Sequence, residues 1–202
     1  MKKANIAVLV SGGGTNLQAL IDAQSAGIIN SGEIKLVISN NPNAYALERA
    51  KNAGISAAVV TKKQYADGFE EAIDEYLKKF DIDLIVLAGF MSILSEKFTK
   101  EHDGRILNVH PSLIPSFCGK GFYGLRVHEA ALEYGVKVTG ATVHFVNEIP
   151  DGGRIIAQKA VYIEENDTPE TLQKRVMEQA EWIILPQAVE TVSAQIIKEN
   201  IK

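Results

Sequence analysis

The stretch Ile6-Ala-Val-Leu-Val-Ser-Gly-Gly-Gly-Thr-Asn-Leu17 joins an apolar run to a glycine loop and to the start of a helical pattern. The apolar run has the length of a strand that is buried on both faces. Glycines allow a tight turn, and the helical pattern continues from there to about residue 26. The stretch therefore predicts a strand, a sharp loop and a helix that packs back on the strand.

The same alternation of short apolar runs and amphipathic stretches fills the first two thirds of the chain. Repeated strand–helix units predict a parallel sheet covered by helices on both faces, with right-handed crossovers. The expected strands are 6–10, 34–38, 57–60, 84–88 and 106–109, and the expected helices are 16–26, 44–53, 68–80 and 95–102. We therefore expect an α/β fold with a Rossmann-like, open and mostly parallel sheet.

The pattern changes in the last third of the chain. Residues 136–146 alternate apolar and small polar side chains, and 155–163 follow them across a turn, which indicates an antiparallel hairpin. A last helix is expected from the N-cap residue Thr168 to about 198, with a kink or break at Pro186. Its apolar stripe includes Leu172, Val176, Ile183, Ile184 and Val189.

The composition excludes several classes of protein. The 202 residues include 46% hydrophobic and 23% charged residues, which is typical of a globular chain. The formal charge of -4 offers no basic field to a nucleic-acid backbone. Cys118 is the one cysteine, so no internal disulfide can form, and no apolar stretch approaches the ~20 residues of a membrane span. We therefore expect one domain over 1–202, cytoplasmic, monomeric or homodimeric, with no nucleic-acid or membrane partner.

Gly12, Gly13 and Gly14 follow a strand and precede a helix, where backbone N–H groups and the helix dipole converge on an anion. Thr15 and Asn16 add side-chain donors. A tight turn alone is the alternative, although three adjacent glycines exceed what a turn needs. The loop lacks the third glycine and the acidic residue of a dinucleotide fingerprint, and also the lysine of a P-loop. It predicts a simple phosphate or phosphosugar site.

Asn108 and His110 lie two residues apart in an expected strand that Pro111 ends, so both side chains share one face at its carboxyl end. Ligands bind at this edge of open α/β sheets. The histidine is a candidate proton-transfer group, and a buried asparagine needs a partner for its amide. Two hydrogen-bonded polar residues that cap a strand are the alternative. The irregular segment 111–124 that follows has the length of a functional loop.

Asp151 lies in the turn Pro150-Asp-Gly-Gly153, where its role is either purely structural or lies in a contact with His110. A carboxylate beside that histidine would favour the charged ring, which can donate a proton or stabilise an oxyanion. Metal chemistry is not expected, because the four histidines are scattered and His128-Glu129 lacks the second histidine of a zinc-protease motif. Cys118 is better explained as a small apolar filler than as a nucleophile.

Five segments carry a resemblance to a known family: Ser11-Gly-Gly-Gly-Thr-Asn-Leu17, Ser39-Asn40, Leu87-Ala-Gly-Phe-Met-Ser-Ile-Leu94, Asn108-Val-His-Pro-Ser-Leu-Ile-Pro115 and Gly140-Ala-Thr-Val-His-Phe-Val-Asn-Glu-Ile-Pro-Asp-Gly-Gly153. In these segments the chain resembles the phosphoribosylglycinamide formyltransferases, the folate-dependent enzymes of purine synthesis. The last two segments are specific in combination, because an asparagine, a histidine and a later aspartate follow in the family's order.

The resemblance implies transfer of a formyl group from 10-formyltetrahydrofolate to the primary amine of 5-phosphoribosylglycinamide, in the synthesis of IMP and without a metal. Asn108 and His110 would stabilise the tetrahedral oxyanion, and His110 would also take part in proton transfer. Asp151 would hold His110 in its charged form and help to relay the proton. The folate pocket would be lined by Met91, Ser92, Ile93, Leu94, Asn108, Asn147, Glu148, Ile149, Pro150 and Asp151, largely through backbone contacts.

The resemblance also assigns the substrate-binding residues. Gly14, Thr15 and Asn16 would bind the phosphate, in agreement with the anion site argued from the glycine loop. A family glutamate that binds the ribose corresponds to Glu181, counted back from Pro186 with a one-residue insertion in the alignment.

The chain departs from the family at three places. Ser92 stands where an arginine is common, an arginine is missing around 66–68, and the loop 116–124 is longer than the family's usual form. The first two departures concern contacts with the folate tail or the substrate, and the third changes the shape of the loop beside the site.

Two other functions fit parts of the sequence. A methionyl-tRNA formyltransferase or a formyltetrahydrofolate hydrolase is expected to carry an additional domain, and the length of 202 residues disfavours both. A noncatalytic phosphosugar-binding or nucleotide-binding module would keep the glycine loop but would have no need for Asn108, His110 and Asp151 together.

Overall fold

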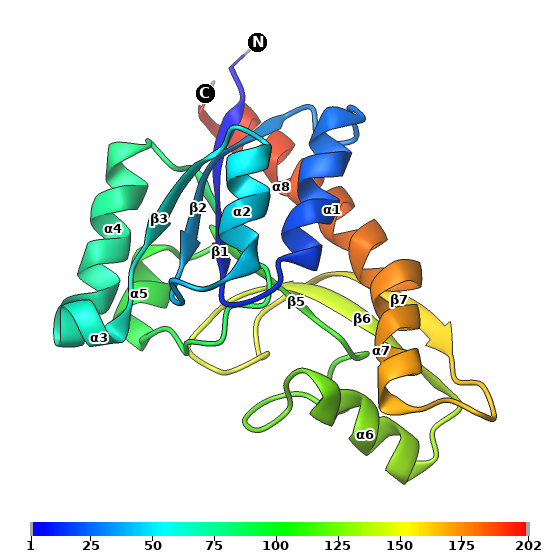
Figure 1. The fold of residues 1–202 in the computed structure, drawn as a ribbon. Coiled ribbons are helices and arrows are strands. Elements are labelled where there is room, and N and C mark those ends of the chain that lie inside the picture. The colour runs from blue at the N-terminus through cyan, green and yellow to red at the C-terminus, as the bar shows by residue number, and fades with distance from the viewer. Residues whose placement is uncertain (1, 201–202) are drawn as a thin grey trace.

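The computed structural model describes residues 2–200 and contains a seven-stranded sheet in the order β3-β2-β1-β4-β5-β6-β7 (Figure 1). The first five strands pair in parallel, whereas β6 is antiparallel to both β5 and β7. The expected Rossmann-like sheet with a C-terminal antiparallel hairpin is confirmed. The strands are β1 Ala4–Val10, β2 Gly32–Ser39, β3 Ser56–Val59, β4 Leu84–Leu87, β5 Ile106–His110, β6 Val138–Phe145 and β7 Ile155–Tyr162.

Helices cover both faces of the sheet, as predicted, and α3, η1 and α6 are additions to the expected set. The helical elements are α1 Thr15–Ser25, α2 Tyr45–Asn52, α3 Lys62–Tyr65, η1 Ala66–Gly68, α4 Phe69–Lys79, α5 Glu96–Glu101, α6 Leu125–Tyr134, α7 Pro169–Val176, η2 Met177–Glu181 and α8 Trp182–Asn200. Alternate residues of β1 enter different apolar clusters because successive side chains of a strand point to opposite faces. Ile6 and Val8 pack on the side of α1, α2 and α8, while Ala7 and Leu9 pack on the side of α4 and α5.

The last helical region begins where the sequence predicts. Thr168 accepts a hydrogen bond from the backbone N–H of Thr171, whose side chain bonds back to the Thr168 backbone, and Pro169 takes the first helical position. The break expected at Pro186 is wrong, since α8 continues through that residue. The distortion lies just before it, in the π-helical segment η2. A proline ring crowds the carbonyl of the preceding turn, and a wider π turn is one way in which a helix absorbs such a disturbance.

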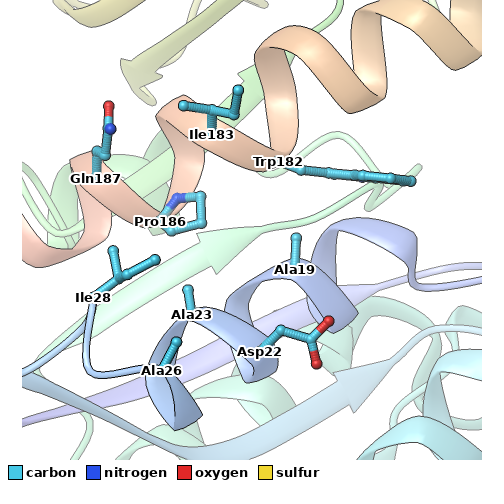
Figure 2. A pocket seen from close by; sticks show the side chains of 9 residues that line it. All are labelled: Ala19, Asp22, Ala23, Ala26, Ile28, Trp182, Ile183, Pro186 and Gln187. Atoms are coloured by element: carbon cyan, nitrogen blue, oxygen red, sulfur yellow. The ribbon is translucent and has the colours of Figure 1, made fainter.

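Ile183 does not belong to the apolar stripe that the sequence pattern predicted. From Val176, steps of four residues lead to Ala180 and Ile184, both buried, whereas Ile183 is 40% exposed. Figure 2 shows Ile183 and Pro186 across a shallow apolar groove from Ala19 and Ala23 of α1, with Ile28 at its end. Within residues 2–200, no helix combines the length and the apolar composition needed to cross a membrane.

Candidate active site

The glycine loop after β1 needs only one of its glycines for the turn itself. Gly14 has φ +72°, and a Cβ there would lie 2.7 Å from the Ala46 Cβ. A Cβ on Gly12 or Gly13 would meet nothing within 4 Å, and neither residue has a positive φ. The tight-turn alternative therefore accounts for Gly14 alone, and the open space at Gly12 and Gly13 permits a ligand to approach the backbone closely.

Asn16 and Glu181, which are 165 residues apart in the sequence, are in direct contact. The Asn16 Nδ2 donates to the Glu181 Oε2 at 2.7 Å, and the buried Oδ1 of Asn16 has no hydrogen-bond partner among the described residues. Burial raises the pKa of Glu181 to about 7, and the hydrogen bond from Asn16 opposes part of that shift. Thr15 Oγ1 lies 3.8 Å from the Met177 sulfur. The segment η2 thus packs against the glycine loop and brings the expected phosphate and ribose residues together.

Asn108 and His110 share one face of β5, and the antiparallel neighbour β6 places partners opposite them. The register pairs Asn108 with His144 and His110 with Thr142. Asn108 Nδ2 lies 3.3 Å from His144 Nε2, while His144 Nδ1 lies 2.8 Å from the Phe145 carbonyl oxygen. The carbonyl can only accept, so His144 Nδ1 donates to it, while Nε2 faces the side-chain amide of Asn108.

His144 is a site residue that the sequence reasoning missed. Thr142 and His144 are spaced two apart in an expected strand, just as Asn108 and His110 are, which was the available signal. Only the register between the two strands shows that these polar pairs meet.

Asp151 lies between two imidazole rings. Its Oδ2 is 3.5 Å from His110 Nδ1, and its Oδ1 is 3.6 Å from His144 Nε2. The Gly119 N–H donates to Oδ2 at 2.8 Å. Burial by itself raises the pKa of Asp151, but the contact with His144, the charge of His110 and the Gly119 N–H outweigh burial and hold this pKa below its usual value. Asp151 is therefore a carboxylate near neutral pH.

His110 is surrounded by acceptors. Its Nε2 lies 2.8 Å from the Phe117 carbonyl oxygen, and its Nδ1 faces the Asp151 carboxylate. The ring is only 4% exposed. Because a carbonyl and a carboxylate can only accept, both nitrogens are satisfied as donors when the ring is doubly protonated and positively charged. The contacts of His110 with the loop 111–124 and with Asp151 go beyond those of a simple strand cap.

A second histidine behind this centre stays neutral. His128 on α6 is fully buried, and neither ring nitrogen has a hydrogen-bond partner among the described residues. Burial, and to a smaller extent the positive charge of His110, lowers the pKa of His128 to about 4.

A pocket opens beside Asn108, His144 and Asp151. The predicted folate residues Ser92, Ile93, Leu94, Asn108, Asn147, Glu148, Ile149, Pro150 and Asp151 all line it. Met91 does not line it; its side chain is 56% exposed, and its backbone N–H donates to the Ser11 Oγ at 2.8 Å. The further lining residues are Leu87, Phe90, Thr99, His144 and Val146. The pocket thus combines apolar side chains with amide, imidazole and carboxylate groups.

The places where the chain departs from the family pattern have defined contacts. Ser92 Oγ accepts a hydrogen bond from Asn40 Nδ2 at 2.9 Å, which ties the loop after β2 to the pocket. The loop 111–124 supplies the Phe117 carbonyl and the Gly119 N–H to the site. Burial, followed by the charge of Asp151, raises the pKa of the Cys118 thiol, which disfavours the reactive thiolate. In residues 2–200, no three or more His, Cys, Asp or Glu side chains are grouped to share a metal ion.

Comparison with known proteins gives a consistent result. The formyl transferase family model matches residues 4–189. The phosphoribosylglycinamide formyltransferase of Haemophilus influenzae is 45% identical, over 100% of this chain and 92% of its own length. The human trifunctional purine biosynthetic protein adenosine-3 is 47% identical over 98% of this chain, which spans only 19% of that protein.

A solved structure agrees with these relatives. Glycinamide ribonucleotide transformylase 1 from Symbiobacterium toebii superimposes with a TM-score of 0.88 at 41% identity, covering 96% of this chain and 89% of its own. The chain therefore belongs to the formyl transferase family, among the phosphoribosylglycinamide formyltransferases.

Proposed function

We propose that this protein transfers the formyl group of 10-formyltetrahydrofolate to the primary amine of 5-phosphoribosylglycinamide. The observation that carries the proposal is the cluster of Asn108, His144 and Asp151 in the lining of one pocket, with His110 Nδ1 3.5 Å from the Asp151 carboxylate. The likeness to phosphoribosylglycinamide formyltransferases supports the same reaction.

The phosphorylated substrate binds at the glycine loop. Backbone N–H groups of Gly14, Thr15 and Asn16 hold the phosphate at the N-terminus of α1. The Glu181 carboxyl group, fixed by Asn16, receives the ribose hydroxyls. The acidic charge balance of the chain makes these local donors necessary, because no general positive field attracts the phosphate.

The formyl folate binds in the apolar pocket. Ile93, Leu94 and Ile149 offer apolar surface to its ring system, and backbone groups of 91–94 and 147–151 meet its polar edge. The formyl carbon then lies near Asn108 and Asp151. The proposed reaction requires no metal ion, because formyl transfer needs only correct positioning of the two substrates and stabilisation of the charge that develops.

The reaction is a direct transfer. The substrate amine attacks the formyl carbon, forming a C–N bond and a tetrahedral oxyanion, which an Asn108 N–H and the charged His110 stabilise. The bond from the formyl carbon to the folate nitrogen then breaks. The amine loses one proton and the folate nitrogen gains one, and Asp151 with His110 relays it.

An assay of formyl folate consumption with and without phosphoribosylglycinamide tests the proposal. Consumption that requires the amine and yields the formylated product supports it. Consumption without the amine identifies a hydrolase. No consumption under either condition contradicts an enzymatic function, and either of these two results overturns the proposal.

A further inference from the structure

The backbone carbonyls of the glycine loop, from Ser11 to Gly14, all accept hydrogen bonds from protein groups. Ser11 O accepts from Asn41 Nδ2 at 3.2 Å, and Gly12 O accepts from the Ala46 N–H at 3.1 Å. Gly13 O accepts from Arg49 Nε at 2.8 Å, and Gly14 O accepts from the Gln18 N–H at 2.9 Å. Because the C=O and the N–H of one trans peptide lie in the same plane and point in opposite directions, these bonds also fix the direction of the N–H groups of residues 12–15, which point away from the partners of the carbonyls.

Arg49 supplies the one charged group in that set. Besides holding Gly13 O, it donates from Nη1 to Gln18 Oε1 at 2.9 Å, and its guanidinium lies 5.0 Å from the centre of the Tyr45 ring. It takes part in none of the ion pairs found in the described part of the chain. A positive charge without a carboxylate partner therefore lies directly beside the glycine loop.

We propose that Arg49 is the positioning residue of the phosphate site: it holds the Gly13 carbonyl toward α2, so that the loop presents its N–H groups to the phosphate, and it places a positive charge beside them. The inference rests on the proposed function and deepens it. Arg49 acts through the loop, since two of its donors are already engaged with protein groups. A lysine keeps the charge but cannot hold two acceptors with a planar fork.

Three variants test the role of Arg49. Arg49→Gln removes the charge and the paired donors, and Arg49→Lys keeps only the charge. Lys51→Gln is the matched control, because Lys51 lies on the same helix, is 77% exposed and pairs only with Glu48 at 3.8 Å. The first readout is the shift in unfolding temperature that ribose 5-phosphate causes, with ribose as the probe lacking phosphate. This readout needs no catalysis.

We expect ribose 5-phosphate to stabilise the wild type and Lys51→Gln equally, Arg49→Lys less, and Arg49→Gln hardly at all. In the formyl-transfer assay, Arg49→Gln should raise the KM for phosphoribosylglycinamide about 10- to 100-fold, the effect of losing charge-assisted hydrogen bonds. The kcat and the KM for formyl folate should stay within about threefold, since Arg49 neither lines the folate pocket nor contacts His110 or Asp151.

The inference is overturned if Arg49→Gln binds ribose 5-phosphate as the wild type does, or if its kcat falls while the KM is unchanged. The ligand-free Arg49→Lys protein and the wild type should unfold at similar temperatures, which would establish that the proteins being compared are folded. A wild type that binds ribose 5-phosphate but transfers no formyl group would contradict the proposed function and still leave the role of Arg49 measurable.

Discussion

The backbone of Asp151 has an unfavourable conformation in the turn that brings its side chain to the site. Its φ of +57° lies in the left-handed region, which non-glycine residues rarely adopt. The next two residues have no room for a side chain: a Cβ on Gly152 would lie 2.7 Å from Ile149 side-chain atoms, and one on Gly153 would overlap the Phe145 carbonyl. The turn is thus required by packing, and it also delivers a carboxylate to His110 and His144. The structural and functional interpretations of this turn are compatible.

Removing either member of the His110–Asp151 pair should slow the reaction. We expect His110→Ala and Asp151→Asn each to lower turnover by at least about a hundredfold, the scale of losing an acid–base or oxyanion-stabilising group. Steady-state kinetics with both substrates saturating measures the effect. Asp74→Asn serves as the control, because Asp74 pairs with His102 at 2.7 Å between α4 and α5, outside the site. Turnover near the wild-type rate in either site variant would remove that residue from the mechanism.

Gly13 and Gly14 should respond differently to substitution by alanine. Gly13→Ala should leave the free energy of unfolding unchanged or raise it by up to about 1 kcal/mol, since the added Cβ has space and the unfolded chain loses freedom. It should raise the KM for phosphoribosylglycinamide, because the Cβ occupies the side from which the phosphate approaches.

Gly14→Ala should instead lower the free energy of unfolding by at least about 1 kcal/mol, from the left-handed conformation and the clash with Ala46. Urea denaturation of the two variants checks the contrast. A large loss of stability in Gly13→Ala would mean that the loop is only a turn.

At the scale of elements, the α7–η2–α8 region links the fold to the site. Its start is capped by Thr168, its middle carries Glu181 to the glycine loop, and its later turns pack in the core through Leu185 and Val189. The local signals for the cap were strong enough to be read from the sequence. The π-helical segment η2 could not be predicted from the sequence, because the formation of a π-helical turn depends on the surfaces that the helix packs against.

Thr168→Ala should lower the free energy of unfolding by about 1 kcal/mol, because it leaves an orphan N–H at the start of α7. Thermal and urea unfolding measure this loss. Thr61→Ala is the matched control, since Thr61 caps only the four-residue α3, and its effect should be smaller. Equal losses of unfolding free energy in the two variants would show that the cap of α7 stabilises the fold no more than the cap of the short helix α3 does.

At the scale of the whole molecule, Glu181 couples folding to pH. The carboxyl group ionises near 4.5 in the unfolded chain and near 7 in the folded one. Between these values the folded state holds a proton that the unfolded state has lost, so the free energy of unfolding falls as pH rises. The full effect is on the order of 3 kcal/mol.

Glu181→Gln should remove this fall, so that the difference in unfolding free energy between wild type and variant changes by up to that amount from pH 4.5 to pH 8. Urea denaturation across this range measures it. Glu178→Gln, one turn earlier and half exposed beside Lys174, should leave the pH dependence as in the wild type. A pH dependence that is the same in Glu181→Gln and the wild type would contradict the assignment.

His128 has the opposite effect on the pH dependence of the free energy of unfolding. Its pKa is lowered from 6.5 to about 4, so the unfolded state takes up a proton first and stability falls as pH drops through that window. Glu181 and His128 therefore oppose each other between pH 4.5 and 6.5, and single substitutions are needed to separate them.

The sequence by itself determined the alternation of strands and helices apart from α3, η1 and α6, the start of the last helical region at Thr168, and the shared face of Asn108 and His110. Each of these follows from local periodicity and turn chemistry, which act over a few residues. Only the tertiary structure decided that Asp151 and His144 meet His110 and Asn108, that Glu181 bonds Asn16, and that Arg49 holds the Gly13 carbonyl. These contacts join residues between 36 and 165 positions apart in the sequence. They depend on strand register and on the packing of helices against loops, neither of which is encoded within any single stretch of the chain.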